Sequence, residues 1–462
     1  MMQTLEAWLG AASDVVWGWP MLALLFGTHI FLTFRLRFIQ GYLGKAIRLS
    51  LKRGREGSGD ISQFGALTTA LAATIGTGNI VGVATAVAAG GPGAVLWMWL
   101  TGVFGVATKY AEALLAVKYR VVNRDGMMAG GPMYVLERGL GQRWLGVVFA
   151  LLTAVTAFGI GNMVQANSIS QMVATTFGIS PWWTGGVMTV LTAVVILGGI
   201  KSIARICEAL VPFMAIFYVV GCLILLAMEW HRLPHTLSLI VQSAFTGHAA
   251  VGGFLGAGMR EAVRFGIARG LFSNESGLGS APIVAAAAQT KNPVRQALVS
   301  STGTFWDTVV VCAITGLVLV NSMEWTKGLV GAELTHAAFA DLPVVGPVVL
   351  TVGLLTFVFS TILGWSYYGE KAVEYLAGAR AVPPYRWLWV AMVLVGSVVT
   401  LPIVWSFADI ANALMAVPNL VALLLLSGVA VAETRTYLWS GNLEAEAPPV
   451  DNPERNSKEV PE

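Results

Sequence analysis

The feature that most constrains this chain is a repeated apolar run about 20 residues long, a length that crosses a bilayer as one α-helix. Strands of a membrane β-barrel would instead show runs of about 10 residues with alternating character. Charged residues make up 11% of the 462 positions and hydrophobic residues 56%, whereas a soluble domain carries about 25% charged residues. The sequence therefore predicts an all-α polytopic membrane protein that is surrounded by the lipid bilayer.

Eleven apolar runs are long enough to be membrane spans. They cover residues 15–38, 62–90, 93–118, 144–171, 182–200, 206–228, 262–289, 296–320, 344–370, 385–404 and 406–432. The segment after the first run is rich in Lys and Arg, from Arg35 to Arg55, which the positive-inside rule places in the cytoplasm. We therefore expect the N-terminus outside and, with an odd number of spans, the C-terminus in the cytoplasm.

The ten spans after the first divide into two groups of five that start on opposite sides of the membrane, which predicts an inverted repeat. The expected divisions are an N-terminal helix and basic loop (1–61), a first repeat (62–228), an extracytoplasmic connector (229–261), a second repeat (262–432) and a disordered tail (433–462). Each repeat opens with a span that helix-unfriendly residues interrupt, at Ile75–Asn79 and at Ser273–Gly277. Paired interruptions of this kind point to a transporter binding site near the membrane midplane.

The first interruption, AATIGTGN at residues 72–79, has glycine, threonine and asparagine where a lipid-facing helix would have leucine. Such a segment can unwind, and an unwound segment at membrane depth is tolerated only around a cavity. Freed N–H groups near Gly76, Thr77 and Gly78 would receive an amino-acid carboxylate, and freed carbonyls would hold a cation. The alternative is close packing of two helices through small residues.

The second interruption places Ser273, Asn274, Glu275, Ser276 and Gly277 at membrane depth, where polar groups are costly unless they serve a pathway. Carbonyls and hydroxyls here could hold a substrate ammonium or a sodium ion, because hard cations take oxygen ligands. Glu275 is either a proton-titrating site or a structural partner for a freed N–H or for Arg269, and we favour the structural role.

Two further polar groups lie inside apolar runs. Ser360 and Thr361 can present two hydroxyls to the first broken helix, or they can bond only to their own helix. Asn162, Gln165, Asn167 and Gln171 make an unusually polar stretch in the fourth span, which lines a cavity or joins neighbouring helices.

Several other classes of protein lack support in the sequence. The net charge of +3 is spread over the loops, so we expect no nucleic-acid partner. A channel would need a filter motif, and an intramembrane enzyme would need a nucleophile with a base or a metal cluster. Neither pattern is present, since the histidines are scattered and the cysteines Cys207, Cys222 and Cys312 fall singly in apolar runs as packing residues.

The segment GGPGAVLWMWLTGVFG at 90–105 resembles the signature of the alanine or glycine:cation symporter family, with Leu96 where phenylalanine is usual. Three other segments are similar to family motifs: IGTGNIVGVATA at 75–86, GGPMYVLERGLG at 130–141 and RGLFSNESGLGSAP at 269–282. The resemblance covers residues 15–435. It implies a LeuT-type inverted-repeat transporter with one extra N-terminal helix, in the cytoplasmic membrane of a bacterium or archaeon.

The resemblance also implies the activity and the site. The expected activity is sodium-coupled symport of small neutral amino acids by alternating access, with alanine and glycine as substrates and D-alanine or serine as further candidates. A proton-coupled symporter that uses Glu275, Glu112, Glu208 or Asp307 is the rival. By position, Thr74, Gly76 and Gly78 face the substrate, and Gln165 and Trp365 limit its size. The sodium ligands implied are the carbonyls of Ala72 and Ile75, the Ser360 and Thr361 hydroxyls, and Asn79.

Overall fold

The computed structural model describes residues 2–52, 56–246, 258–340, 344–399 and 402–450. Within these residues the regular secondary structure is helical, apart from one antiparallel pair of short strands, β1 (Val121–Val122) and β2 (Met128–Ala129), and two isolated β-bridges. Helices of the N-terminal half are α1 (Met2–Val16), α2 (Trp19–Arg35), α3 (Leu43–Ser50), α4 (Gln63–Thr74), the π-helical turn η2 (Gly78–Gly82), α5 (Val83–Gly90), α6 (Gly93–Lys118), α7 (Pro132–Tyr134), α8 (Arg143–Phe158), η4 (Gly159–Met163), α9 (Val164–Phe177), α10 (Pro181–Ile196) and α11 (Gly199–Met228).

The second half continues the helical pattern. Its helices are α12 (Leu233–Phe245), α13 (Met259–Asn274), α14 (Pro282–Ala285), α15 (Pro293–Thr304), η6 (Phe305–Cys312), α16 (Ala313–Asn321), α17 (Gly331–Ala340), α18 (Val345–Ala377), α19 (Val382–Val398), α20 (Pro402–Leu425) and α21 (Ser427–Thr434). The remaining elements are short turns: η1 (Ile39–Tyr42), η3 (Val135–Gly139), η5 (Trp230–Arg232), η7 (Glu324–Lys327), η8 (Ala379–Ala381) and η9 (Arg435–Trp439).

Seven helices in the described residues are long and apolar enough to cross a membrane, and up to nine if each of two bent pairs counts as one span. One bent pair is Gln63–Thr74 with Gly78–Gly90, which turns by 55° at the first predicted interruption. The other is Trp19–Arg35 with Ile39–Ser50, which turns by 67°. These helices confirm an all-α membrane protein.

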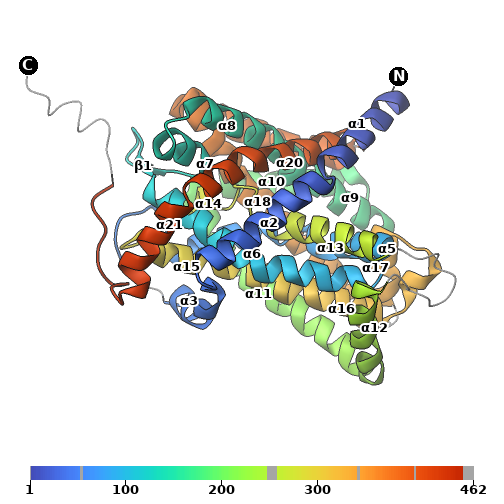
Figure 1. Cartoon of the computed structure of the whole chain (residues 1–462). Coiled ribbons are helices and arrows are strands. Elements are labelled where there is room, and N and C mark those ends of the chain that lie inside the picture. The colour runs from blue at the N-terminus through green and yellow to red at the C-terminus, as the bar shows by residue number, and fades with distance from the viewer. Residues whose placement is uncertain (1, 53–55, 247–257, 341–343, 400–401, 451–462) are drawn as a thin grey trace, which may run out of the picture.

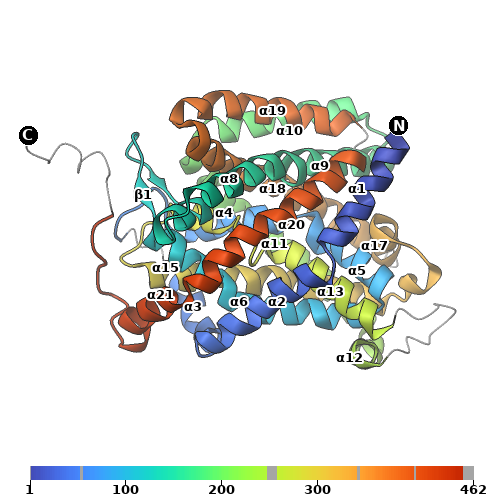
Figure 2. The ribbon, with the colours of Figure 1, turned by 45° about the horizontal axis from the view of Figure 1, so that its top comes forward.

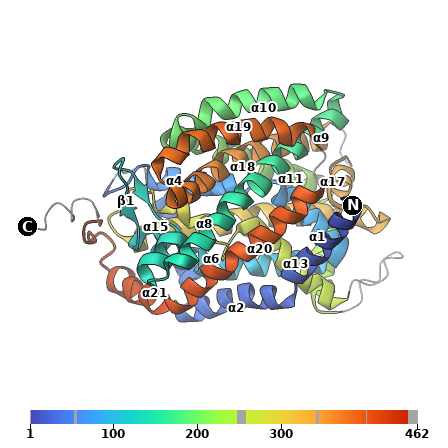
Figure 3. The same cartoon turned by 90° about the horizontal axis from the view of Figure 1, so that it is seen from above.

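Apolar side chains on the outer helices face away from the bundle. On α10 the exposed side chains include Trp182, Val187 and Val194, and on α11 they include Phe213 and Ile216. A soluble protein rarely exposes apolar surface so extensively, whereas a membrane protein presents it to lipid. Figure 3 shows α10 and α19 side by side along this edge of the molecule.

The two broken helices lie inside the bundle. Helix α4 packs against α11 and α18, and α13 packs against α5 and α6. Helix α6 also packs along α15, so these helices enclose the ends of α4 and α13 (Figures 1 and 2). The interrupted segments are thereby shielded from lipid, which is the condition under which unwound backbone persists at membrane depth.

Several helices occur where the sequence was expected to form loops. Helix α3 lies within the basic segment after the first span, α12 lies in the connector, and α17 precedes the ninth span. In Figures 1 and 2, β1, α3 and α21 gather at one end of the bundle, whereas α12, α17 and the start of α1 gather at the other. The predicted first span corresponds to α2, and α1 is a separate helix before it.

Candidate functional site

The first break begins where α4 ends at Thr74. Ile75 has an extended backbone with φ −76° and ψ 96°, and the chain then resumes as the π-helical turn η2. The side chain of Asn79 accepts a 2.9 Å hydrogen bond from the Gly76 N–H. A local side chain thus satisfies one N–H that the interruption frees, which stabilises the break.

The continuous helix α18 brings two hydroxyls to this break. Ser360 Oγ lies 3.2 Å from the carbonyl oxygen of Ala72, and Thr361 Oγ1 lies 3.4 Å from that of Ile75. Both hydroxyls also lie within hydrogen-bond distance of their own helix, at the carbonyl oxygen of Phe357. The structure therefore brings together the four oxygens that the resemblance to the family implied. Oxygens of this kind suit a hard cation.

The backbone at Gly76 closely approaches this group of oxygens. A Cβ at Gly76 would lie 2.6 Å from Thr361 Oγ1 and 3.7 Å from Gln165 Oε1. The Gln165 amide donates to the carbonyl of Ile160 at 3.0 Å and reaches the Thr77 hydroxyl at 3.4 Å. Gly76, Thr77 and Gln165 therefore form one polar surface beside the four oxygens.

The other polar residues of the fourth predicted span hold helices together. Asn162 donates to the carbonyl of Trp389, and Asn167 donates to the carbonyls of Gly396 and Val399, all in or next to α19. Gln171 is exposed. Of the two interpretations left open for this stretch, joining of helices holds for the two asparagines.

The second break begins where α13 ends at Asn274. Glu275 has φ 54°, and the chain regains helical structure only in the single turn of α14. The carboxylate oxygen Oε1 of Glu112 accepts hydrogen bonds from the N–H groups of Gly277 and Gly279, at 3.0 and 3.1 Å. Asn419 donates to the same oxygen at 2.7 Å. Helix α6 thus supplies the acceptor that the unwound segment needs.

A second polar cluster links the two breaks. Asn79 Nδ2 donates to Asp307 Oδ1 at 2.6 Å, and Ser273 Oγ donates to Asp307 Oδ2 at 3.0 Å. The hydroxyl of Thr308 donates to the same Oδ2. Asn79, which was expected among the sodium ligands, therefore lies beside Asp307 and takes no part in the Ser360 and Thr361 contacts.

Glu275 pairs with other groups than those expected. Its Oε1 accepts a 3.1 Å hydrogen bond from Trp365 Nε1, and its Oε2 accepts one from the Ser280 hydroxyl. Arg269, one of the two expected kinds of partner, instead lies over the ring of Phe272. The contacts hold the buried Trp365 in place against the second break.

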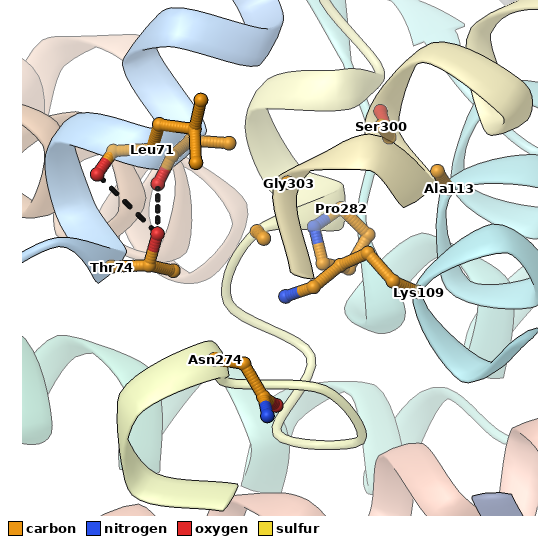
Figure 4. A pocket seen from close by; sticks show the side chains of 10 residues that line it. Leu71, Thr74, Lys109, Ala113, Asn274, Pro282, Ser300 and Gly303 are labelled. Atoms are coloured by element: carbon orange, nitrogen blue, oxygen red, sulfur yellow. Dashed lines mark hydrogen bonds between the residues drawn. The ribbon is translucent and has the colours of Figure 1, made fainter. Parts of the chain in front are cut away.

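Four other predicted residues contact other parts of the bundle. The Ser276 hydroxyl contacts Thr304 Oγ1 at 3.0 Å, and the Gly277 N–H is taken by Glu112. Thr74 and Asn274 line a small cavity with Lys109 and Ser300. Figure 4 shows the Lys109 amine extending between Thr74 and Asn274. The cavity has a volume of about 10 Å³, which is about the space of one water molecule, so no amino acid fits there.

Lys109 and the links from Asp307 to both breaks are what the sequence analysis missed. The cost of a lysine inside an apolar span was the available signal for Lys109. No spacing rule connects Asp307 with Asn79, because 228 positions separate them.

A basic side chain joins the residues that follow α14 to those that precede α4. Arg120 donates to the carbonyls of Ala286, Ala288 and Ser58, at 2.9, 2.7 and 2.8 Å. Burial lowers the pKa of Arg120 to about 10, while nearby Asp60 opposes that shift. Burial also raises the pKa of Asp60, whose carboxylate accepts from the Met128 N–H. Arg120 remains protonated at neutral pH and keeps all its donors.

Known proteins match this chain along nearly its whole length. The model of the sodium:alanine symporter family matches residues 2–451. An uncharacterized transporter of Haemophilus influenzae is 52% identical, over 94% of this chain and 96% of that protein. The sodium/alanine symporter AgcS of Methanococcus maripaludis is also 52% identical, over 93% of this chain and 96% of that protein.

Among solved structures, MhsT in complex with L-phenylalanine is similar to this chain with a TM-score of 0.57 at 13% sequence identity. The match covers 84% of this chain and 95% of MhsT. At this identity the likeness concerns the fold alone, and it agrees with the LeuT-type transporter fold that the sequence motifs implied.

Proposed function

The chain belongs to the sodium:alanine symporter family, and from that premise we propose that it imports alanine together with sodium ions across the cytoplasmic membrane. It is an integral membrane transporter and not an enzyme. Glycine is the second substrate that we propose, and D-alanine and serine are small enough to be tested beside it. A small neutral amino acid and sodium are then its ligands.

One observation carries this proposal. The oxygens of Ala72 and Ile75 belong to the broken helix, and those of Ser360 and Thr361 belong to the continuous helix α18. These two hydroxyls join α18 to the first break. A sodium ion held there would stabilise the state in which these helices lie together. Sodium would thereby favour the substrate-competent conformation, and by linkage the substrate would raise the affinity for sodium.

We propose that the amino acid binds on the other side of Gly76. Its carboxylate would meet the N–H groups of Thr77 and Gly78 beside Gly76, whose own N–H is held by Asn79. Its ammonium would meet oxygens near Ser273. The buried Gln165 and Trp365 would close the pocket around the side chain. Thr74, Asn274, Ser276 and Gly277 would shape the breaks from behind, because their contacts face α6 and α15.

Asn79 is proposed as a cation ligand at a separate position, next to the carboxylate of Asp307. The pair lies between the two breaks, where Ser273 adds a hydroxyl. A sodium ion there would take oxygens from Asp307 and Ser273. The Asn79 amide would have to turn its oxygen from the Gly76 N–H towards the ion, because the atom that faces Asp307 is the amide nitrogen. Oxygens of this kind are the donors that hard cations prefer.

The topology that accompanies this function has eleven spans in a 5+5 inverted repeat. We propose repeats at 62–228 and 262–432, with an added N-terminal helix and basic loop before them (1–61), a connector outside (229–261) and a tail in the cytoplasm (433–462). The basic residues between Arg35 and Arg55 orient the N-terminus outside. Transport would follow from rocking of the bundle that holds both breaks against the remaining helices.

The test is uptake of labelled alanine into proteoliposomes of the purified protein, with an imposed sodium gradient or an imposed proton gradient. We expect sodium-driven uptake that glycine inhibits and leucine does not. Uptake driven only by protons would mean that a carboxylate, and not a sodium site, couples transport to the gradient. If neither gradient drives uptake of alanine, the proposed substrate is wrong.

The rival is a proton-coupled symporter, and the buried Asp307 is the observation that favours it. Asp307→Asn removes its charge, while Glu275→Gln keeps an oxygen that can accept from Trp365. Under sodium coupling we expect Asp307→Asn to raise the sodium KM and Glu275→Gln to change it by less than about twofold. Under proton coupling, Asp307→Asn would abolish uptake driven by a pH gradient.

A further inference from the structure

The lysine in the middle of α6 has no assigned role in the proposed transport cycle. Lys109 is only 4% exposed, and its Nζ has no hydrogen-bond partner among the described residues. An ammonium at membrane depth is costly unless charges around it compensate. Its position must therefore be explained by the groups that surround it.

The ammonium lies where both broken helices stop. The cavity around it is lined by Thr74, the last residue of α4, and by Asn274, the last residue of α13. Figure 4 shows the amine directed towards the space between these two residues, with Pro282 beside the Lys109 side chain. The C-terminus of a helix carries partial negative charge, so a cation placed at two such ends is favourable.

Three buried carboxylates share Lys109 as their cationic neighbour. They are Glu112, Glu275 and Asp307, and each of them interacts electrostatically with Lys109. Their combined negative charge argues against an anion as the occupant of this cavity.

Each of these carboxylates holds one part of the proposed site. Glu112 accepts from the N–H groups of the second break, Glu275 accepts from Trp365, and Asp307 accepts from Asn79. A hydrogen bond to a carboxylate oxygen is stronger when the carboxylate is ionised, so a nearby positive charge strengthens these contacts. One fixed positive charge in their midst keeps all three contacts in place.

We propose that Lys109 is a tethered cation, which supplies between the two breaks the positive charge that a bound metal ion would otherwise supply. It is a positioning residue: it touches neither substrate nor sodium, and acts through Asp307 and Asn79 on cation binding and through Glu275 on Trp365. The inference rests on the proposed sodium coupling and adds to it the residue that organises both breaks.

The test compares Lys109→Met and Lys109→Arg with the control Lys118→Met, which removes a lysine from the end of the same helix where it pairs with Glu433. The first readout is the sodium-dependent thermal shift of the purified protein, with choline chloride as the reference salt. It needs no amino acid, so it is independent of the substrate that we propose. The second readout is the rate of alanine uptake as a function of sodium concentration.

For Lys109→Met we expect the sodium concentration at half-maximal thermal shift to rise roughly 10- to 100-fold, the range for loss of a group that supports metal ligands. Lys109→Arg should recover part of this loss, and Lys118→Met should match the wild type. In the uptake assay, the sodium KM should rise more than kcat falls. A structural lysine alone would lower the unfolding temperature without moving the sodium midpoint.

Chemical rescue covers the case in which Lys109→Met does not fold. Lys109→Ala removes a propylammonium group, so added propylammonium should restore part of the sodium response, while tetramethylammonium should not. If wild type shows no sodium-dependent shift, the proposed sodium coupling fails. If wild type responds but Lys109→Met keeps the same sodium midpoint, or propylammonium restores nothing to Lys109→Ala, the tethered-cation proposal is overturned.

Discussion

The Thr361 hydroxyl lies 3.4 Å from the carbonyl oxygen of Ile75, at the point where α4 has ended and the chain is extended. Together with the contact from Ser360 to Ala72, it joins an unbroken helix to a broken one. An ion can therefore bind all of these oxygens only while the two helices stay close together.

Removing either hydroxyl should weaken sodium binding. A hydrogen bond or ligand contact to a charged group contributes about 1.5 to 3 kcal/mol, so we expect Thr361→Ala and Ser360→Ala each to raise the sodium KM by about 10-fold or more. Thr361→Ser should stay near the wild type. Thr356→Ala is the matched control, since its hydroxyl bonds only within α18. Unchanged sodium dependence in Thr361→Ala would place the ion elsewhere.

A methyl group at Gly76 should close the cation position. Its Cβ would lie 2.6 Å from Thr361 Oγ1, whereas a Cβ at Gly82 would meet nothing nearer than the Thr77 carbonyl oxygen at 3.9 Å. Overpacking of this kind costs about 1 to 3 kcal/mol. We expect Gly76→Ala to reduce sodium-driven uptake at least about tenfold and Gly82→Ala to leave it intact. Equal activity in the two variants would show that the first break accommodates a methyl group at Gly76, which would contradict this prediction.

Trimming Trp365 should relax the limit on substrate size. The ring packs so closely on the fourth span that a Cβ at Gly161 would lie 2.3 Å from Trp365 Cβ. Each methylene that a pocket gains or loses changes discrimination by about 1 to 3 kcal/mol. In Trp365→Phe, we expect leucine to inhibit alanine uptake at about tenfold lower concentration than in the wild type.

Trp389→Phe is the comparison for this variant, because Trp389 is equally buried but lies in α19 against Phe158. It should keep the selectivity of the wild type. Leucine inhibition that changes alike in both variants would mean that general loosening, rather than the wall formed by Trp365, sets the size limit.

Arg120 should contribute more to stability than any exposed arginine. Arg120→Met removes the guanidinium that donates to the carbonyls of Ala286, Ala288 and Ser58. Loss of one partner from a buried charged network costs about 3 kcal/mol or more. The check is thermal unfolding in detergent. Arg143→Met is the control, since that side chain is 81% exposed and surface changes stay within about 0.5 kcal/mol. Similar unfolding temperatures would contradict the role assigned to Arg120.

Local chemistry explains why the breaks could be predicted from the sequence. Gly76 and Gly78 with their flanking threonines disfavour helix, and a run of polar residues at 273–277 is costly in lipid unless it turns inward. The contacts of Ser360 and Thr361 could be expected only through the resemblance to the family. Residue chemistry alone favoured bonding within their own helix, and the structure contains both kinds of contact.

The rest depended on distant segments. Glu112 was noted as a membrane carboxylate, but its contacts with Gly277 and Gly279 cross 165 and 167 positions, and nothing in either segment specifies the other. The same holds for the pairing of Glu275 with Trp365, where the sequence offered the nearer Arg269. Helices α12 and α17 were missed because they are too short to be read as spans.

The hydroxyls of Ser360 and Thr361 each face two acceptors, the Phe357 carbonyl of their own helix and a carbonyl of Ala72 or Ile75 in the first break. A hydroxyl has one proton. In the proposed sodium-bound state both protons would turn to Phe357, and the oxygen lone pairs would face the ion. Without the ion the same protons would return to the carbonyls of Ala72 and Ile75, so each hydroxyl would have an acceptor for its proton in both states.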